Sequence, residues 1–163
     1  HGDVDSLSYL RHVVTHQPLD FVLISTWCMA RPDVEEVQNW LQSGKVKRVD
    51  WYVGEIFPNQ YGDEFELVAD IVRKYGGRCC IARNHSKVML GMNAAADYFV
   101  AIESSANVNT NPRIEQTAIH RCEDLYHFYA DFFADLVSID KHEQPGVAGE
   151  MRRSLRRESA GLP

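Results

Sequence analysis

The chain has 163 residues, of which 45% are hydrophobic and 25% are charged, proportions that are usual for one globular domain. These values exclude a disordered chain, a collagen-like repeat and a small disulfide-dense protein. The 17 basic and 23 acidic side chains give a formal net charge of −6. This charge argues against indiscriminate coating of nucleic acid, although a local basic patch is compatible with it.

Hydrophobicity and cysteine spacing bear on where the protein resides. No apolar segment approaches the length of about 18 residues that a membrane-spanning helix needs. No basic region followed by an apolar run marks a secretory signal at the start of the chain. The four cysteines lack C-x-x-C spacing, and we interpret them as buried free thiols. The sequence therefore predicts a cytoplasmic protein that does not contact a membrane.

The first half of the chain alternates between helical and strand patterns. Apolar spacing predicts helices over residues 6–16, 34–41 and 63–75, and continuous apolar runs predict strands over 21–26 and 49–56. Pro18 ends the first helix, Pro32 opens the second, and the Gly76-Gly77 pair ends the third. Helices that alternate with strands favour parallel pairing in this half.

Strands follow more closely in the second half. Residues 78–82, 85–90, 98–104 and 114–120 read as strands, and residues 123–137 as an amphipathic helix. Such closely spaced strands predict a hairpin. The predicted fold class is α/β, a mixed sheet flanked by helices in a single domain that covers residues 1–138. Residues 139–163 change in composition and carry two arginine pairs, so we expect a basic tail or arm outside the core.

The chemically informative residues fall at the ends of three neighbouring strands. His85 and Lys87 are two positions apart and would face the same side of a strand. Ser105 and Asn107 form an S-x-N triplet at the end of the next strand, and Glu115 begins the strand after it. We therefore expect an imidazole, a cation, hydroxyl and amide donors, and a carboxylate at one end of the sheet.

These residue types suit attack on a phosphodiester. A neutral imidazole is a good nucleophile near pH 7. A lysine supplies positive charge where negative charge gathers on phosphorus, and hydroxyl and amide donors extend that contact. A carboxylate can orient the imidazole and stabilise its charged form. This chemistry requires no metal, and the sequence offers no aspartate cluster to hold one, so we expect neither metal nor cofactor.

The stretches H-S-K and S-S-A-N, followed by I-E-Q, resemble the phospholipase D superfamily, whose pattern is H-x-K-x4-D-x6-G-S-x-N with a downstream acidic residue. This sequence pattern is most similar to that of the single-motif bacterial and phage nuclease-like branch of the superfamily. The resemblance implies that His85 is the nucleophile, which forms a phosphohistidine, and that Lys87 binds phosphate. It also implies that Ser105 and Asn107 are donors to the phosphate and that Glu115 supports the histidine.

The sequence departs from this pattern at three places. Met92 stands where the pattern has its aspartate, and Ser104 stands where it has its glycine. The interval between Lys87 and Ser105 is five residues longer than in the pattern. We interpret the extra length as a longer turn at residues 93–96 that leaves the strand ends in place.

A single H-x-K motif implies, by the same resemblance, a homodimer in which two copies of His85 share one cleft. One histidine would attack and the other would protonate the leaving oxygen. Arg83 and Arg113 flank the motif and are candidate contacts for a phosphate backbone.

The sequence thus predicts a metal-independent phosphodiesterase, with DNA as the favoured substrate. An alternative from another class is a nucleic-acid-binding module of the same fold that turns over slowly or not at all. A third possibility is a phospholipid hydrolase, although the sequence contains no amphipathic membrane-binding segment.

Overall fold

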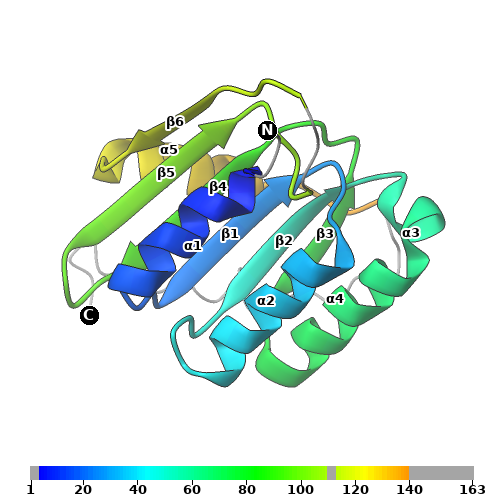
Figure 1. Cartoon of the computed structure of the whole chain (residues 1–163), viewed down its shortest axis with the longest axis horizontal. Helices are drawn as coiled ribbons and strands as arrows, with labels where there is room; N and C mark the ends of the chain where they lie inside the picture. The colour runs from blue at the N-terminus through cyan, green and yellow to red at the C-terminus, as the bar shows by residue number, and fades with distance from the viewer. Residues whose placement is uncertain (1–3, 110–112, 140–163) are drawn as a thin grey trace.

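The computed structural model describes residues 4–109 and 113–139. Six strands form one sheet in the order β3-β2-β1-β4-β5-β6 (Figure 1). The strands are β1 (Phe21–Thr26), β2 (Val49–Gly54), β3 (Arg78–Ala82), β4 (Val88–Asn93), β5 (Tyr98–Ser104) and β6 (Thr117–His120). β1, β2 and β3 are parallel, whereas β4, β5 and β6 each run antiparallel to the preceding strand of the sheet. The predicted mixed sheet is confirmed.

Helices cover both faces of the sheet (Figure 1). One face carries α1 (Ser6–His16), α2 (Arg31–Gln42) and α4 (Gly62–Tyr75), with the single turn α3 (Phe57–Gln60) just before α4. The opposite face carries α5 (Glu123–Ala134). The predicted α/β class, a single domain with a helix-flanked sheet, is therefore confirmed.

The central strand β1 is buried on both faces, which explains its continuous apolar run. Val22 and Ile24 pack in the cluster beneath α1, α2 and α4. Phe21 and Leu23 point the other way, into the smaller cluster that includes Phe133 of α5. Alternate side chains of one strand thus join two hydrophobic cores.

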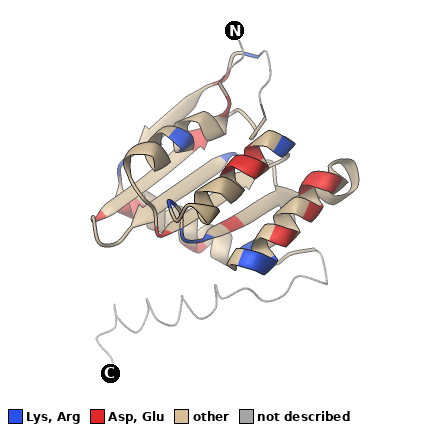
Figure 2. Cartoon of the chain, turned by 60° about the horizontal axis from the view of Figure 1, so that its bottom comes forward, with Lys and Arg blue, Asp and Glu red and all other residues tan. Residues whose placement is uncertain are grey.

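Local signals explain where the helices start. The Asp5 carboxylate accepts a 2.8 Å hydrogen bond from the Ser8 amide, which forms a capping box at α1. Pro32 lies in the first turn of α2, where its missing N–H costs no helical hydrogen bond. Charged side chains lie along the surface helices, and acidic ones predominate on α4 (Figure 2).

Several predicted boundaries are wrong, and two of them matter for function. The strand predicted over residues 85–90 is β4, which begins at Val88, so His85 and Lys87 lie in the loop before it. The strand predicted over 114–120 begins at Thr117, so Glu115 also lies in a loop. In both places side-chain hydrogen bonds replace the ladder. In the first loop, the Asn84 side chain accepts a hydrogen bond from the Ser86 backbone amide. In the second, the Ser105 hydroxyl oxygen accepts one from the Gln116 backbone amide.

Other boundaries differ with less consequence. β2 ends at Gly54, two residues before the predicted end of that strand, and the short helix α3 follows at Phe57–Gln60. α2 begins at Arg31 instead of Val34, and α5 ends at Ala134. The β4–β5 turn spans residues 94–97, one position later than predicted.

The remaining sequence predictions have mixed outcomes. All four cysteines are free, but Cys122 is exposed, contrary to the prediction of buried thiols. No helix of the described ranges is long and apolar enough to cross a membrane. The predicted basic tail lies outside the described residues, except for Ile139.

The glycine pair before β3 offers a test of this packing. Both glycines have positive φ, 76° for Gly76 and 112° for Gly77. A Cβ at Gly77 would overlap the Val49 carbonyl oxygen of β2, whereas a Cβ at Gly76 meets nothing within 4 Å. We expect Gly77→Ala to lower the free energy of unfolding by about 3 kcal/mol or more, and Gly76→Ala by about 1–2 kcal/mol. Urea unfolding measures both, and equal losses would contradict the close approach of Gly77 to β2.

Candidate active site

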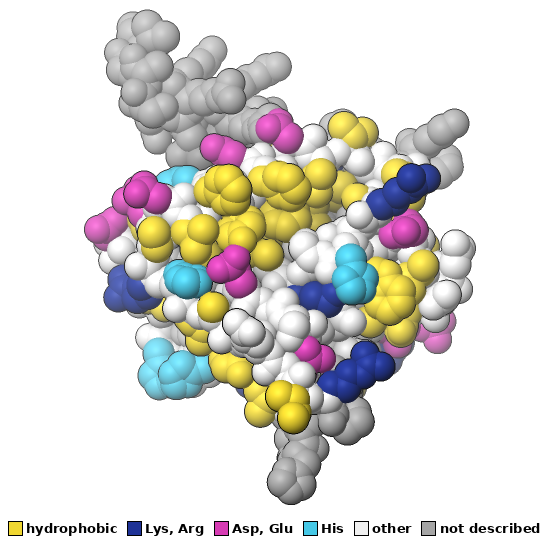
Figure 3. Space-filling view, turned by 90° about the horizontal axis from the view of Figure 1, so that it is seen from above, with side chains coloured by type: hydrophobic (Ala, Val, Ile, Leu, Met, Phe, Trp, Pro, Cys, Tyr) yellow, Lys and Arg dark blue, Asp and Glu magenta, His cyan; other side chains and the backbone are white. Residues whose placement is uncertain are grey.

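The sheet topology brings the predicted site residues to one end of the sheet. β4 begins beside the end of β1, where Ser25 pairs with Val88. β5 ends beside the start of β4, and β6 begins beside the end of β5, where Ser104 pairs with Thr117. The loops that carry His85, Asn107 and Glu115 therefore leave the same end. Figure 3 views the molecule from above, and histidine, basic, acidic and hydrophobic side chains all reach the surface on the face that it shows.

His85 and Lys87 are in direct contact. Lys87 Nζ lies 3.0 Å from His85 Nδ1 and 3.5 Å from Nε2. It also donates a 2.7 Å hydrogen bond to the His85 carbonyl oxygen. A protonated lysine can only donate, so Nδ1 is assigned as the acceptor and a neutral ring then carries its proton on Nε2. The predicted nucleophile and the predicted phosphate-binding cation thus form one unit.

The two side chains differ in their access to solvent. His85 is exposed, whereas Lys87 is only 8% exposed. Burial lowers the pKa of Lys87 from its ordinary value, and the neighbouring Cys28 and Glu115 partly offset that effect. A cation held away from water has strong affinity for an anion that replaces the lost hydration. The contact therefore places a buried cation directly behind an exposed imidazole.

The loop of His85 is anchored by the buried side chain of Asn84. Its Nδ2 group donates to the Tyr52 carbonyl oxygen at 2.8 Å and to Ser25 Oγ at 2.9 Å. Its Oδ1 atom accepts from the Ser86 amide at 3.0 Å and the Ser86 hydroxyl at 2.7 Å. One amide thus joins the histidine loop to β1 and β2.

The S-x-N segment is held by Thr26, the last residue of β1. The Thr26 hydroxyl donates to the Cys28 carbonyl oxygen at 2.9 Å and accepts from the Val108 amide at 3.2 Å. It also lies 3.4 Å from Asn107 Oδ1. Because Oδ1 faces Thr26, Nδ2 is the group that Asn107 can offer to an anion.

Ser105 and Glu115 meet through a direct hydrogen bond from the serine hydroxyl to the carboxylate. The backbone amide of Gln116 donates a 2.9 Å hydrogen bond to Ser105 Oγ. Ser104, the last residue of β5, donates a 2.9 Å hydrogen bond from its backbone amide to the Lys87 carbonyl oxygen. The structure thus joins Ser105 to Glu115 and the histidine loop to β5. The role of Glu115 in supporting His85 stays a prediction.

Arg83 and Arg113 lie at the same end of the sheet, and both are exposed. Arg83 is two residues before His85 in the same loop, and Arg113 is two residues before Glu115. Their contact with a phosphate backbone stays a prediction. Within residues 4–109 and 113–139 there is no group of three or more histidine, cysteine or acidic side chains that could hold a metal ion.

Sequence reasoning assigned no role to Asn84 or Thr26. The sequence held a weak indication of a role for both. Thr26 is a polar residue at the end of the apolar run 21–26, and Asn84 is a polar residue directly before H-S-K. What the sequence does not reveal is that these side chains bond to strands and loops more than 50 positions away, such as Asn84 to Ser25 and Thr26 to Val108.

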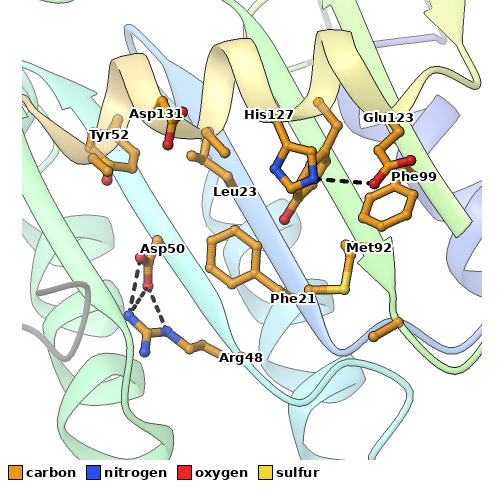
Figure 4. A pocket seen from close by; sticks show the side chains of 14 residues that line it. Phe21, Leu23, Arg48, Asp50, Tyr52, Met92, Phe99, Glu123, His127 and Asp131 are labelled. Atoms are coloured by element: carbon orange, nitrogen blue, oxygen red, sulfur yellow. Dashed lines mark hydrogen bonds and ion pairs between the residues drawn. The ribbon is translucent and has the colours of Figure 1, made fainter. Parts of the chain in front are cut away.

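A cavity of about 310 Å³ lies elsewhere, between α5 and the opposite end of the sheet (Figure 4). Phe21 at the start of β1 and Met92 near the end of β4 line it, together with the Arg48–Asp50 ion pair. Met92, which stands where the resembled pattern has an aspartate, therefore lies at the far end of β4 from Lys87. Its substitution removes no group from the His85–Lys87 contact.

Comparisons with known proteins support the fold and nothing finer. No protein-family model and no curated protein matches the sequence. Among solved structures, polyphosphate kinase from Porphyromonas gingivalis is similar, with a TM-score of 0.57 and 18% identity over 94% of this chain. The chain spans 29% of the length of that kinase. The chain therefore shares its fold with that part of the kinase, and the resemblance to the phospholipase D superfamily stays a prediction.

The Asn84 anchor yields a prediction. Asn84→Ala leaves the buried Tyr52 carbonyl without this donor, so we expect the free energy of unfolding to fall by about 1–3 kcal/mol. The histidine loop should also become mobile, visible as faster amide exchange at residues 85–87. Ser86→Ala is the comparison variant, because it removes the hydroxyl that contacts Asn84 Oδ1 and Ser25 Oγ but leaves both Nδ2 bonds of Asn84 in place, so its effect on exchange should be smaller. Unchanged exchange in Asn84→Ala would show that the amide does not position the loop.

Proposed function

We propose that the protein is a metal-independent phosphodiesterase that cleaves DNA through a phosphohistidine at His85. The observation that carries the proposal is the buried Lys87 ammonium in contact with an exposed imidazole. A phosphate that approaches from solvent reaches the ring first and the cation directly behind it. The Nδ2 group of Asn107 is a further donor at the same end of the sheet. The Ser105 hydroxyl donates to Glu115, so it can serve a phosphate only by leaving that carboxylate.

The first step forms a bond between a ring nitrogen of His85 and phosphorus and breaks the bond to the leaving oxygen. Phosphate binding draws the Lys87 ammonium from the ring to a phosphate oxygen, which frees the lone pair on Nδ1. Either Nδ1 attacks, or Nδ1 takes a proton from water while Nε2 gives its own proton to water, and Nε2 attacks. The ammonium then faces the charge that grows on the equatorial oxygens. In the second step water attacks phosphorus, the N–P bond breaks, and the imidazole is restored. The products are a phosphomonoester and an alcohol.

The leaving oxygen needs a proton, and the described residues offer one histidine at this end of the sheet for both roles. We therefore propose a two-fold dimer in which His85 of a second copy donates that proton. The same histidine then accepts a proton from the attacking water, so the proton balance closes over the cycle.

Two further observations bear on the substrate. The similar solved structure is named as a polyphosphate kinase, a protein that handles a phosphate polymer, and this chain matches 29% of its length. The exposed Arg83 and Arg113 flank the site and suit a phosphate backbone. A nucleic-acid-binding module without turnover is the alternative, favoured by the resting contact of Lys87 with Nδ1, which occupies the candidate nucleophile.

The nucleophile is tested with labelled DNA in excess EDTA. We expect wild-type protein to cleave, and a covalent protein–DNA adduct to survive an alkaline quench, because phosphohistidine is labile in acid and stable in base. His85→Ala should abolish both signals, and Lys87→Ala should slow cleavage by roughly 10²–10³-fold. Lys87→Arg should rescue only in part, because a planar guanidinium does not replace a compact ammonium.

His12→Ala, on the exposed surface of α1, is the matched control and should cleave at the wild-type rate. Cleavage that stops in EDTA and returns with magnesium would overturn the mechanism. Binding without cleavage, unchanged by His85→Ala, would favour the binding module.

If two chains share one cleft, a His85→Ala chain should suppress the activity of the wild-type chain with which it forms a dimer. When wild-type chains exchange with an excess of His85→Ala chains, heterodimers carry one histidine where two are needed, so we expect activity per wild-type chain to fall steeply. Excess His12→Ala chains should leave it unchanged. Activity is followed with labelled DNA and assembly by sedimentation. An active monomer would rule out the shared site.

A further inference from the structure

Trp27 follows the last residue of β1 and borders the candidate site. Its ring centroid lies 5.5 Å from that of His85, with the two planes at 55°. The chain has three tryptophans, all within the described residues, and Trp40 and Trp51 are 6% and 0% exposed. Trp27 is half-buried, so it is the one indole that a ligand at the site can reach.

The position of Trp27 depends on Gly54 at the end of β2. A Cβ on Gly54 would lie 2.5 Å from Trp27 Cδ1, 2.9 Å from the Trp27 carbonyl oxygen and 3.2 Å from the Asn84 carbonyl oxygen. Because Gly54 has no side chain, both the Trp27 indole and the histidine loop can pack against the end of β2. An indole supported in this way keeps its orientation toward the site at little entropic cost on binding.

We infer that Trp27 is a stacking platform for a nucleobase beside the scissile phosphate, and that the substrate is single-stranded where it crosses the site. The inference rests on the proposed function for its ligand. A base can stack on an indole only when it has left its own stack, which an unpaired strand permits and an intact duplex resists. Such stacking is tolerant of sequence, because every base has a π face.

Charge points the same way. The net charge of −6 gives little general attraction for a duplex, which presents twice the phosphate density of one strand. A site with one buried ammonium and two exposed arginines gains affinity for a single strand from an aromatic contact. The alternative role for Trp27 is to position the His85 ring, and the experiment separates the two roles.

The first measurement is tryptophan emission of His85→Ala protein, which we expect to bind without turnover, during titration with a single-stranded 12-nucleotide DNA or its blunt duplex. We expect quenching by the single strand and little by the duplex. Trp27→Leu in the same background should remove the quenching and weaken binding of a dye-labelled strand by roughly five- to hundredfold. Trp27→Phe should retain part of the affinity, and Trp40→Phe should keep the quenching. Equal quenching by both DNAs, or unchanged affinity in Trp27→Leu, would overturn the inference.

The second measurement changes the DNA as well as the protein. His85→Ala protein is given single strands in which each nucleotide in turn is abasic, and we expect one position to lose about as much affinity as Trp27→Leu loses in the same background. When that abasic strand binds Trp27→Leu protein, we expect no further loss of affinity beyond the loss that either change causes alone. If Trp27 only positions His85, the substitution slows cleavage of intact and abasic strands alike, and the inference fails while the proposed function stands. Trp27-dependent single-strand binding without cleavage would leave the inference standing and overturn the proposed phosphodiesterase.

Discussion

The candidate site depends on the buried side-chain amide of Asn84. Its two N–H groups reach the Tyr52 carbonyl oxygen and Ser25 Oγ, and its oxygen accepts from Ser86. Buried amides are costly without partners, and this one satisfies both donors and its acceptor. Because β1 and β2 are fixed in the centre of the sheet, the amide transfers their rigidity to a loop that has no ladder of its own. The position of His85 is therefore set by strands that are remote in sequence.

That rigidity extends across the end of the sheet. Lys87 ends the same loop, and its carbonyl oxygen accepts from the Ser104 amide at the end of β5. Thr26 holds the S-x-N segment from the end of β1 through the Val108 amide. The loops that carry the site are thus bonded to strand ends, a more precise support than a loop provides alone. The fold and the site share one set of constraints, because the same central strands hold the two hydrophobic cores together.

Much of the fold could be predicted from the sequence, because its signals are local. The run 21–26 is apolar throughout since β1 is buried on both faces, and Gly76-Gly77 stops α4 because both glycines adopt positive φ. The loop before β4 could not be predicted in this way. H-S-K-V-M-L continues the alternation of a strand, but Asn84 bonds to remote residues and turns the chain before Val88. The same limit applies to Glu115, since its partner Ser105 is identified only once β5 and β6 are paired.

The burial of Lys87 bears on whether the site binds or reacts. A module that only attracts phosphate gains enough from exposed lysines, which need not give up hydration. A buried ammonium is costly in the ligand-free protein, and its lowered pKa reflects that cost. In low dielectric, however, the same cation interacts more strongly with each increment of negative charge. Charge on the non-bridging oxygens is more concentrated in a five-coordinate transition state than in the bound diester. If His85 is the nucleophile that we propose, the buried cation beside it stabilises the transition state more than the ground state, which is the physical requirement for catalysis.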